Sequence, residues 1–474
     1  MKNTASAITA AAAALAASAD ADAASAAAQT PAPVSAATPP SPRQSHATAD
    51  FLGSIGIVTT MPDRGQPIDK TIEMINYCGF RWIRGGIEGV KEEAGAPTTV
   101  ETYIELCKAT NAKVNWGLVS GGSDLEKLLR TARKLDEAGV LLAFEGNNEP
   151  NNWGVTYQGE KGGRSESWIP LAKLQRDFYA AVKADPQFKK YPVWGPSEMG
   201  AQTDNVGLQF LAIPEGADTV MPPGTKYADA LNVHNYIYHG AAPRYEDNKT
   251  WNCSSPGPDC KIDGLWGNHG LTWGKKFKGY SEAELAAIPK VTTETGTTIG
   301  GDVTEEIHGR HLVNIFLSQF ARGWSHTSIY LLRDRTDESG NQTFGYFNTD
   351  YTPRKAAVYL HNFTTILADK KTDIEMSVNH AAAAKSATAS LAYAIENQTP
   401  TTHDLLLQHS SGKFQLVIWG EKAQGSDTVT VRFTSPRAVK IYDPTVGAEP
   451  VEILAAADSL KLEVSDHPFV LEIQ

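Results

Sequence analysis

The sequence has few cysteines and few basic residues for its length, and no long apolar run follows its N-terminal region. Its 474 residues include 4 Cys, and 43 Lys and Arg residues are outnumbered by 54 Asp and Glu residues, for a formal net charge of −11. This acidic surplus argues against a nucleic-acid-binding protein, because contact with the phosphate backbone needs a clustered positive field. A transmembrane helix needs about 20 consecutive apolar residues, so no integral membrane segment is expected beyond the N-terminal region.

The cysteines do not form a metal-binding pattern. No Cys-x-x-Cys pair is present in the sequence, and structural zinc sites are commonly built from such pairs. Cys253 and Cys260 flank a turn-rich loop, and Cys78 and Cys107 end two successive helical patterns. Each pair is either a disulfide or two free thiols, and the sequence leaves both alternatives open. No cofactor-binding motif is present either, so we expect neither a cofactor nor a metal.

The first fifty residues do not resemble a folded domain. Lys2 is followed by an alanine-rich stretch and by small-residue sites at residues 19–23, which is the arrangement of a secretory signal peptide. We therefore predict a signal peptide at residues 1–23 and a secreted or periplasmic protein, with a disordered tail as the alternative. Residues 24–50 are rich in Ala and Pro, which predicts an unfolded linker. On this interpretation the folded part begins at Phe51.

From Phe51 the chain alternates short apolar runs with amphipathic stretches, which predicts an α/β fold of parallel strands covered by helices. Eight strands are predicted in series, at residues 52–60, 80–84, 113–119, 140–145, 192–195, 230–234, 289–293 and 327–332. Eight strand–helix units favour a closed (β/α)8 TIM barrel over residues 51–370.

The pattern changes after about residue 370. Short strands separated by turn residues are predicted at residues 404–408, 414–419, 427–433, 438–443, 459–464 and 468–473. We therefore expect residues 371–474 to form a C-terminal antiparallel β-sandwich domain.

Two glutamates lie where predicted barrel strands end, and the catalytic residues of such barrels are found at these positions. Asn148-Glu149 follows the fourth strand, and Glu294 follows the seventh. A pair of carboxyl groups suits glycoside hydrolysis, in which one protonates the leaving oxygen and the other attacks the anomeric carbon or activates water. Glu145 also lies near the end of the fourth strand, and we prefer Glu149 because Asn148 precedes it and can bond a sugar hydroxyl.

These motifs resemble glycoside hydrolase clan A, the retaining (β/α)8 glycosidases in which an Asn-Glu pair ends strand four and a nucleophilic Glu ends strand seven. The resemblance covers about residues 51–370. It is nearest in appearance to the β-xylosidase/iduronidase and exopolysaccharide-hydrolase branch or to cellulase-like relatives. It implies that Glu149 is the acid/base residue and Glu294 the nucleophile.

The same resemblance implies supporting roles for residues near the ends of strands two and six. Arg84 ends strand two, where a fixed positive charge would hold Glu294 ionised. His234 and Tyr236 follow strand six, where a tyrosine hydroxyl would donate to Glu294 and orient it. A structural salt bridge for Arg84 and an ordinary core position for His234 are the alternatives.

Aromatic residues gather in the segments after strands four and six. Flat rings there either stack on sugars or pack the loops themselves. The rings are those of Trp153, Tyr157, Trp168, Trp251, Trp266 and Trp273. Of these we predict that Trp153, Tyr157, Trp266 and Trp273 contact the substrate.

The predicted function is therefore a retaining glycoside hydrolase that cleaves β-glycosidic bonds in a polysaccharide or oligosaccharide by double displacement. A catalytically silent carbohydrate-binding barrel is one alternative, and a transglycosylase that uses the same two glutamates is another. The sugar, its linkage and the choice between endo and exo cleavage do not follow from the sequence.

Overall fold

A computed structural model describes much of the chain after residue 38. The described residues are 39–59, 61, 66–93, 96–150, 152–163, 167–199, 222, 224–237, 243–254, 279–335, 343–369 and 388–474. The predicted signal peptide, Cys260, Trp266 and Trp273 lie outside these residues. Within the described residues, no helix has both the length and the apolar character needed to cross a membrane.

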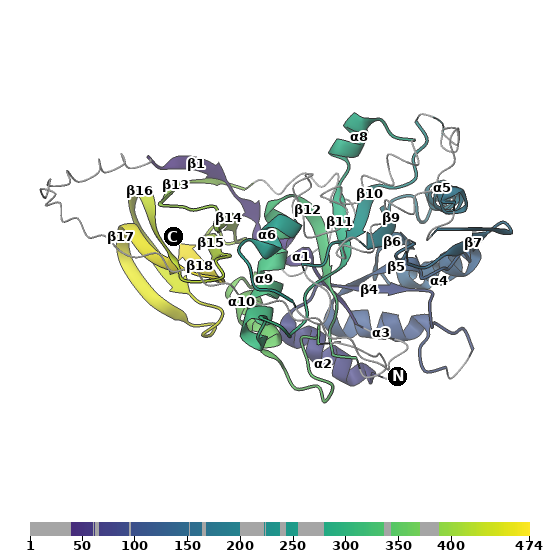
Figure 1. Ribbon diagram of the computed structural model, residues 1–474, viewed down its shortest axis with the longest axis horizontal. Coiled ribbons are helices and arrows are strands. Elements are labelled where there is room, and N and C mark those ends of the chain that lie inside the picture. The colour runs from purple at the N-terminus through teal and green to yellow at the C-terminus, as the bar shows by residue number, and fades with distance from the viewer. Residues whose placement is uncertain are drawn as a thin grey trace, which may run out of the picture. The chain divides into compact units, whose positions relative to one another are not determined.

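Eight parallel strands close into a barrel, as the strand–helix alternation predicted (Figure 1). They follow one another around the barrel in chain order, which places all their carboxyl ends at one rim. The strands are β3 (Ile55–Val58), β4 (Trp82–Gly86), β5 (Lys113–Val119), β6 (Leu141–Asn147), β9 (Val193–Met199), β10 (Ala230–His234), β11 (Lys290–Thr295) and β12 (Trp324–Ile329). The first strand is shorter than predicted, because its expected start belongs to the helix α1 (Thr48–Gly53).

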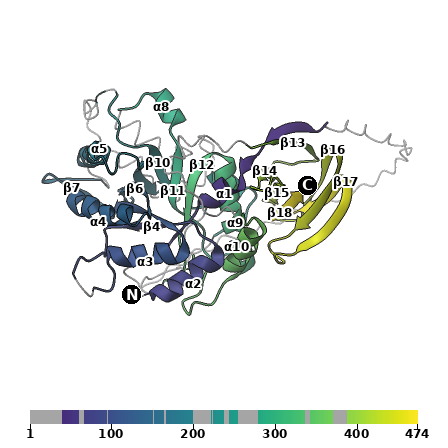
Figure 2. The same ribbon diagram turned by 180° about the vertical axis from the view of Figure 1, so that it is seen from behind.

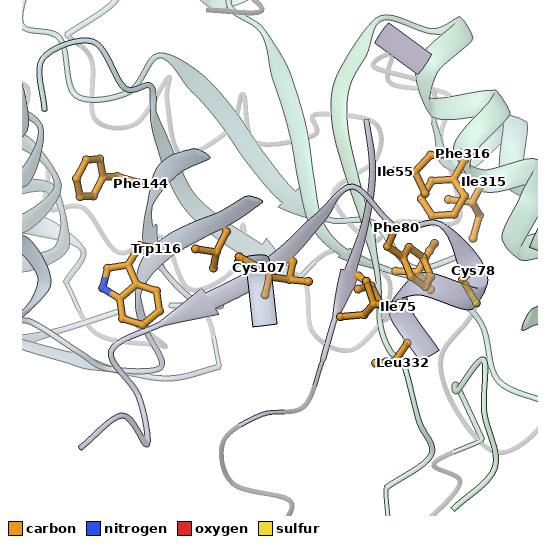
Figure 3. Close-up of a cluster of buried hydrophobic side chains, with 14 of the residues drawn as sticks. Ile55, Ile75, Cys78, Phe80, Cys107, Trp116, Phe144, Ile315, Phe316 and Leu332 are labelled. Atoms are coloured by element: carbon orange, nitrogen blue, oxygen red, sulfur yellow. The ribbon is translucent and has the colours of Figure 1, made fainter. Parts of the chain in front are cut away.

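Helices cover the outside of this barrel. They are α2 (Ile68–Cys78), α3 (Val100–Thr110), α4 (Leu125–Glu137), α5 (Ile169–Ala184), α9 (Glu305–Ala321) and α10 (Lys355–Ile366), with the short α6 (Lys249–Cys253) and α8 (Glu282–Ala287) between β10 and β11 in the chain. The helices α2, α3 and α4 lie side by side in both views (Figures 1 and 2). Their apolar faces pack on the strands, as Figure 3 shows for Ile75 of α2, Cys107 of α3 and Trp116 of β5.

Cys78 and Cys107 are free thiols. Cys78, Cys107 and Cys253 are buried and unpaired with one another. Cys78 and Cys107 pack in the apolar core, where burial raises the pKa of both thiols. Of the two alternatives, free thiols therefore hold for Cys78 and Cys107. The alternatives for Cys253 and Cys260 remain open, because Cys260 lies outside the described residues.

The barrel interior is filled by side chains in layers, because alternate residues of each strand point inward. The lowest layer is largely apolar: Trp82 and Trp194 meet edge to face with ring centroids 5.5 Å apart, and His326 packs against both. Gly56 leaves room for this layer, since a Cβ atom there would lie 2.1 Å from the Trp82 ring. One inward position further along the strands, the layer becomes polar. Its residues are Arg84, Asn115, Glu145, Asn232 and Thr293.

The predicted C-terminal antiparallel β domain is present, but it is one eight-stranded sheet. Its strands are β1 (Ser41–Gln44), β2 (His46–Ala47), β13 (Ser390–Glu396), β14 (Thr402–Gln408), β15 (Phe414–Gly420), β16 (Asp427–Tyr442), β17 (Pro450–Val464) and β18 (Pro468–Ile473). The strand order is β1-β13-β16-β18-β15-β14-β2, with β17 paired to β16. Because residues 430–433 of β16 pair with β13 and residues 439–442 pair with β18, this one strand joins the two halves of the sheet.

The N-terminal boundary of the fold differs from the prediction. Residues 41–47, which were expected to be unfolded linker, form β1 and β2 at the two edges of the C-terminal sheet. Arg43 forms an ion pair with Asp404 at 3.0 Å, and Thr48 donates to Gln415 at 2.8 Å. These strands depend on partners far along the chain, so their Pro- and Ser-rich sequence carried no local signal.

Specific polar contacts join the barrel to the C-terminal sheet. Asn314 of α9 donates to the carbonyls of Gly420 and Asp466 at 3.2 and 3.0 Å, and Arg310 pairs with the Asp466 carboxylate at 2.9 Å. The fully buried carboxylate of Glu421 accepts hydrogen bonds from the backbone N–H groups of Thr250 and Trp251 at the start of α6. The sheet therefore helps to hold the segment that follows β10.

Candidate active site

Glu149 and Glu294 lie at the carboxyl-terminal rim of the barrel. Glu294 is near the end of β11, and Glu149 lies two residues beyond β6. The backbone at Glu149 has a φ of 42°, a left-handed conformation that is strained for a non-glycine residue and is often found at functional sites. Its N–H donates to Ser197 Oγ at 3.3 Å, and its carboxylate accepts from Asn152 Nδ2 at 2.9 Å. The turn therefore fixes the direction of the Glu149 carboxyl group.

The Glu294 carboxylate is held by two donors, Arg84 of β4 and Tyr236, which lies two residues beyond β10. One Oε atom accepts from Arg84 Nη1, and the other accepts from the Tyr236 hydroxyl at 2.8 Å. Burial and the charges of Glu294 and Glu149 raise the pKa of Tyr236 well above its ordinary value, so the phenol keeps its proton and acts as a donor. With both oxygen atoms held in this way, the Glu294 side chain remains 13% exposed at the rim.

The two carboxyl groups face each other across a short distance. Oxygen atoms of Glu149 and Glu294 and a ring nitrogen of His234 all lie within 4.8 Å of one another. His234 Nδ1 is 2.7 Å from Glu149 Oε1 and 3.6 Å from Glu294 Oε2. His234 is therefore a buried partner of Glu149 and not an isolated core histidine.

The protonation of Glu149 depends on this histidine. Burial raises the pKa of Glu149, but the hydrogen bond and charge of His234, the amide of Asn152 and the charge of Arg84 together hold it below its ordinary value. His234 Nδ1 and Glu149 Oε1 are 2.7 Å apart, so one proton lies between these two facing atoms.

A third carboxylate, that of Glu145, lies beneath this pair in the polar layer and is 1% exposed. It accepts from Arg84 Nε at 3.1 Å and from Arg84 Nη2 at 2.6 Å, and also from Asn115 Nδ2. Arg84 Nη2 also donates to Asn148 Oδ1 at 2.9 Å. Arg84 is thus anchored by Glu145 below while it contacts Glu294 and Asn148 above.

The geometry of the site is also that of three metal ligands, which would be Glu149, His234 and Glu294. The chemistry of the surroundings does not fit a cation. Each of the facing atoms already has a hydrogen-bond partner in the protein, and the Arg84 guanidinium contacts Glu294 directly. A bound metal ion would therefore lie beside a fixed positive charge, and we assign no metal to this site.

The structure brings together six of the predicted site residues and separates others from them. The group comprises Arg84, Asn148, Glu149, His234, Tyr236 and Glu294. Tyr157 does not join it, because its hydroxyl donates to Asp177 of α5 at 2.9 Å. Trp153 is 53% exposed in the segment just after Glu149, so its ring is available to a ligand.

Other aromatic residues of these segments pack within the protein. Trp168 is fully buried at the start of α5. Trp251 stacks on His403 of the C-terminal sheet with ring centroids 4.0 Å apart, and Arg322 covers it at the same distance. The alternative considered for these rings, that they pack the loops themselves, therefore applies to Trp168 and Trp251.

Several supporting polar residues around the two glutamates were not predicted from the sequence. Asn115 and Asn232 lie inside largely apolar strands, Thr293 lies in the threonine-rich strand β11, and all three contact Glu145. Asn152 contacts Glu149. A buried amide or hydroxyl within an apolar strand needs a hydrogen-bond partner. Three such residues at inward positions near an arginine were therefore an available signal for a polar layer inside the barrel.

Comparison with known proteins gives matches in structure and none in sequence. No protein-family model matches the chain, and no curated protein matches it. Among solved structures, a family 39 glycoside hydrolase from the gut symbiont Bacteroides cellulosilyticus WH2 matches with a TM-score of 0.56 at 16% identity, covering 90% of this chain and 82% of the other. CelM2, a bifunctional glucanase-xylanase from a metagenome library, matches with a TM-score of 0.53 at 12% identity, covering 91% and 96%.

A further match lies in another glycoside hydrolase family. The family 51 α-L-arabinofuranosidase of Thermotoga petrophila RKU-1 has a TM-score of 0.50 at 10% identity, covering 92% of this chain and 98% of that one. The chain therefore shares the fold of clan A glycoside hydrolases, an eight-stranded barrel with an attached β domain.

Proposed function

We propose that the protein is a retaining glycoside hydrolase in which Glu294 is the nucleophile and Glu149 is the acid/base residue. The observation that carries the proposal is the separation of these side chains, whose facing oxygen atoms lie within 4.8 Å. Retaining glycosidases have carboxyl groups about 5–5.5 Å apart, whereas inverting enzymes leave about 6.5–9.5 Å for a water molecule. The fold shared with glycosidases is consistent with this assignment.

The surroundings of each carboxyl suit its role. Arg84 and Tyr236 donate to Glu294, which favours the ionised form that attacks the anomeric carbon. Glu149 shares a proton with His234 and passes a proton to the leaving oxygen as the glycosidic bond breaks. In the second step Glu149 accepts a proton from water, and this water hydrolyses the glycosyl–Glu294 ester.

The substrate class is proposed as a β-linked polysaccharide or oligosaccharide. The exposed Trp153 ring lies four residues after the acid/base residue in the chain, and we propose that it contacts the sugar on the leaving-group side. Flat aromatic rings bind the apolar faces of sugars, and a free monosaccharide glycoside would not reach beyond the rim. Export of the enzyme through a signal peptide at residues 1–23 is part of the same proposal.

The decisive experiment is azide rescue of the two glutamate variants on activated aryl β-glycosides. We expect Glu294→Ala to lower kcat by about 1,000-fold or more, and added azide to restore turnover with an α-glycosyl azide product. Glu149→Ala with azide should instead give the β-glycosyl azide, because the attack then occurs on the glycosyl-enzyme. Product configuration is read by NMR.

A matched control is Glu160→Ala, an exposed carboxyl of β8 (Glu160–Gly162) that pairs with Lys173. It should keep wild-type turnover. Absence of any azide adduct with Glu294→Ala would refute the nucleophile assignment. Transfer to added sugar acceptors in preference to water would make the protein a transglycosylase with the same residues, and glycan binding without turnover would make it a binding protein.

A further inference from the structure

We propose that Thr293 and Glu145 are positioning residues that keep a hydrogen on Nε2 of His234, so that Nδ1 faces Glu149 and shares its transferable proton. The inference deepens the proposed function and rests on it, because it gives the route by which Glu149 is supplied with a proton. It starts from one hydroxyl group, that of Thr293, which lies between Glu145 and His234.

The Thr293 hydroxyl has three polar side-chain neighbours. Its Oγ1 atom is 2.8 Å from Glu145 Oε1, 3.1 Å from His234 Nε2, and 3.0 and 3.2 Å from Asn232 Nδ2 and Oδ1. A hydroxyl has one hydrogen to donate and two lone pairs to accept with. The Asn232 amide nitrogen can only donate, so it occupies one of the two lone pairs.

The hydrogen of this hydroxyl is directed by Glu145. The Glu145 carboxylate accepts hydrogen bonds from Arg84, Asn115 and Asn232, and it forms an ion pair with Arg84 at 2.6 Å. If Thr293 donated to His234 or to Asn232 Oδ1 instead, two oxygen lone pairs would face each other at 2.8 Å between Thr293 and Glu145 in a buried site. Thr293 therefore donates to Glu145, and its remaining lone pair accepts a hydrogen from His234 Nε2.

This assignment determines what His234 does toward Glu149. With a hydrogen held on Nε2, the Nδ1 atom lies 2.7 Å from Glu149 Oε1 with one proton between them. When the glycosidic bond breaks, that proton goes to the leaving oxygen, and the pair is left as an ionised Glu149 beside a neutral ring. In the second step the attacking water returns a proton to the pair, so protons balance over the cycle.

The other charged groups around His234 and Glu149 are the same in the wild type and in the Thr293 variants. Those that face His234 or Glu149 are Arg84 of β4, Glu145 of β6, Glu294 of β11 and the Tyr236 phenol. Removing only the Thr293 hydroxyl leaves each of them in place, which makes Thr293 the residue to change.

The first test is substrate-free NMR of 15N-histidine-labelled full-length protein, with His234 signals assigned from those absent in His234→Gln. We expect the wild type and Thr293→Ser to hold a hydrogen on Nε2 throughout pH 5–8. Thr293→Val places a methyl group at Nε2, and we expect the neutral ring to shift to the Nδ1–H tautomer, donating to an ionised Glu149. A wild-type ring with Nδ1–H and a bare Nε2 would overturn the proposal, even if Thr293→Val does not fold.

The second test compares leaving groups. Thr293→Val should lower kcat/KM by about 10- to 100-fold for 4-nitrophenyl glycosides. It should have less effect on 2,4-dinitrophenyl glycosides, whose departure needs no proton. The basic limb of its pH profile should move to lower pH, while Thr293→Ser stays near wild type. Equal losses with both leaving groups, or equal losses in both variants, would mean a merely structural role.

The two proposals fail in different ways. If the wild type hydrolyses no glycoside, the proposed function fails while the tautomer of His234 is still measured. If hydrolysis depends on Glu149 and Glu294 but the ring carries its hydrogen on Nδ1 alone, the function stands and the roles of Thr293 and Glu145 are refuted.

Discussion

Glu145 and Glu149 lie four residues apart, yet their surroundings give them different chemistry. Glu145 points into the barrel from β6 and is enclosed by donors, whereas Glu149 lies past the end of the strand and faces Glu294. In the sequence, the preceding Asn148 was the one reason to prefer Glu149 over Glu145 as the acid/base residue. The inward direction of Glu145 follows from strand alternation, but the left-handed turn at Glu149 has no sequence signal, since no glycine marks it.

Trp153 is the aromatic residue for which a substrate role is most directly testable. Its N–H donates to the Glu149 carbonyl at 2.8 Å, so its backbone is fixed while its ring is 53% exposed. We expect Trp153→Ala to raise KM for oligosaccharides by about 2- to 10-fold, because one stacked ring contributes roughly 0.5–1.5 kcal/mol. Michaelis–Menten kinetics on oligosaccharides and on an aryl glycoside of the same sugar measure this effect.

The KM for the aryl glycoside and the melting temperature serve as internal controls, since neither should change in Trp153→Ala. Val446→Ala, which removes a 73% exposed side chain of the C-terminal domain, is the matched surface variant. An unchanged KM for every oligosaccharide would exclude a contact between this ring and the substrate.

At the scale of elements, α6 connects the C-terminal sheet to the rim of the barrel. Glu421 accepts from Thr250 and Trp251 at its first turn, and Cys253 at its last turn bonds the Asn235 carbonyl at 2.5 Å. Asn235 lies between His234 and Tyr236, both of which contact a proposed catalytic glutamate. A five-residue helix has little stability of its own, so its position depends on these contacts.

Removal of the Glu421 carboxylate should therefore destabilise the protein. Burial raises the pKa of Glu421 against the hydrogen bonds from Thr250, Trp251 and Ser318, and Glu421→Ala leaves these donors without an acceptor. We expect a loss of about 2–3 kcal/mol in the free energy of unfolding, measured by urea denaturation at pH 7. The exposed Glu449→Ala should give no change. A loss below about 0.5 kcal/mol would show that α6 does not depend on this contact.

The elements that sequence patterns predicted best are those with a buried face. All eight barrel strands were predicted, because each is a short apolar run between helical segments. The two strands predicted at 427–433 and 438–443 are one strand, β16, since its exposed middle residues 434–436 interrupt the apolar alternation without ending the pairing with β17. Pairing of this kind is a tertiary property that local periodicity does not contain.

At the scale of the whole molecule, three buried histidines make the fold sensitive to acid. Burial lowers the pKa of His308 and of His403 to about 3 and that of His311 to about 4, from an ordinary value of 6.5. The unfolded chain therefore binds more protons than the folded protein below about pH 6.5. The contribution of these histidines to the free energy of unfolding is fully present above about pH 6.5. It is lost as the pH falls from about 6.5 toward 3–4, by up to about 1.4 kcal/mol per pH unit for each histidine.

Urea denaturation at pH 7, 6 and 5 measures this dependence. His403→Phe keeps the aromatic packing against Trp251 and Trp419 while it removes one titrating group, so the slope of stability against pH should become smaller. An identical slope in the variant would mean that His403 is not held neutral in the folded protein.

The candidate site was more predictable than the chain boundaries. Glu149, Glu294, Arg84, His234 and Tyr236 could be placed because strand ends meet at one rim of a barrel. The start of the fold could not, because β1 and β2 are held by strands more than 300 residues away and have no apolar face of their own. The polar layer under the site also depends on which strands are neighbours, which no single segment encodes.

The pairing of β1 with β13 has a consequence for synthesis. Gln44 accepts a hydrogen bond from Ser390, 346 residues later. At about 5–20 residues per second, a ribosome makes that partner roughly 20–70 seconds after β1 emerges. Throughout this interval the complete barrel is translated while the edge strand has nothing to pair with. We therefore expect the C-terminal sheet to form after the barrel. A nascent-chain factor that sequesters residues 41–47 should delay the formation of this sheet more than that of the barrel.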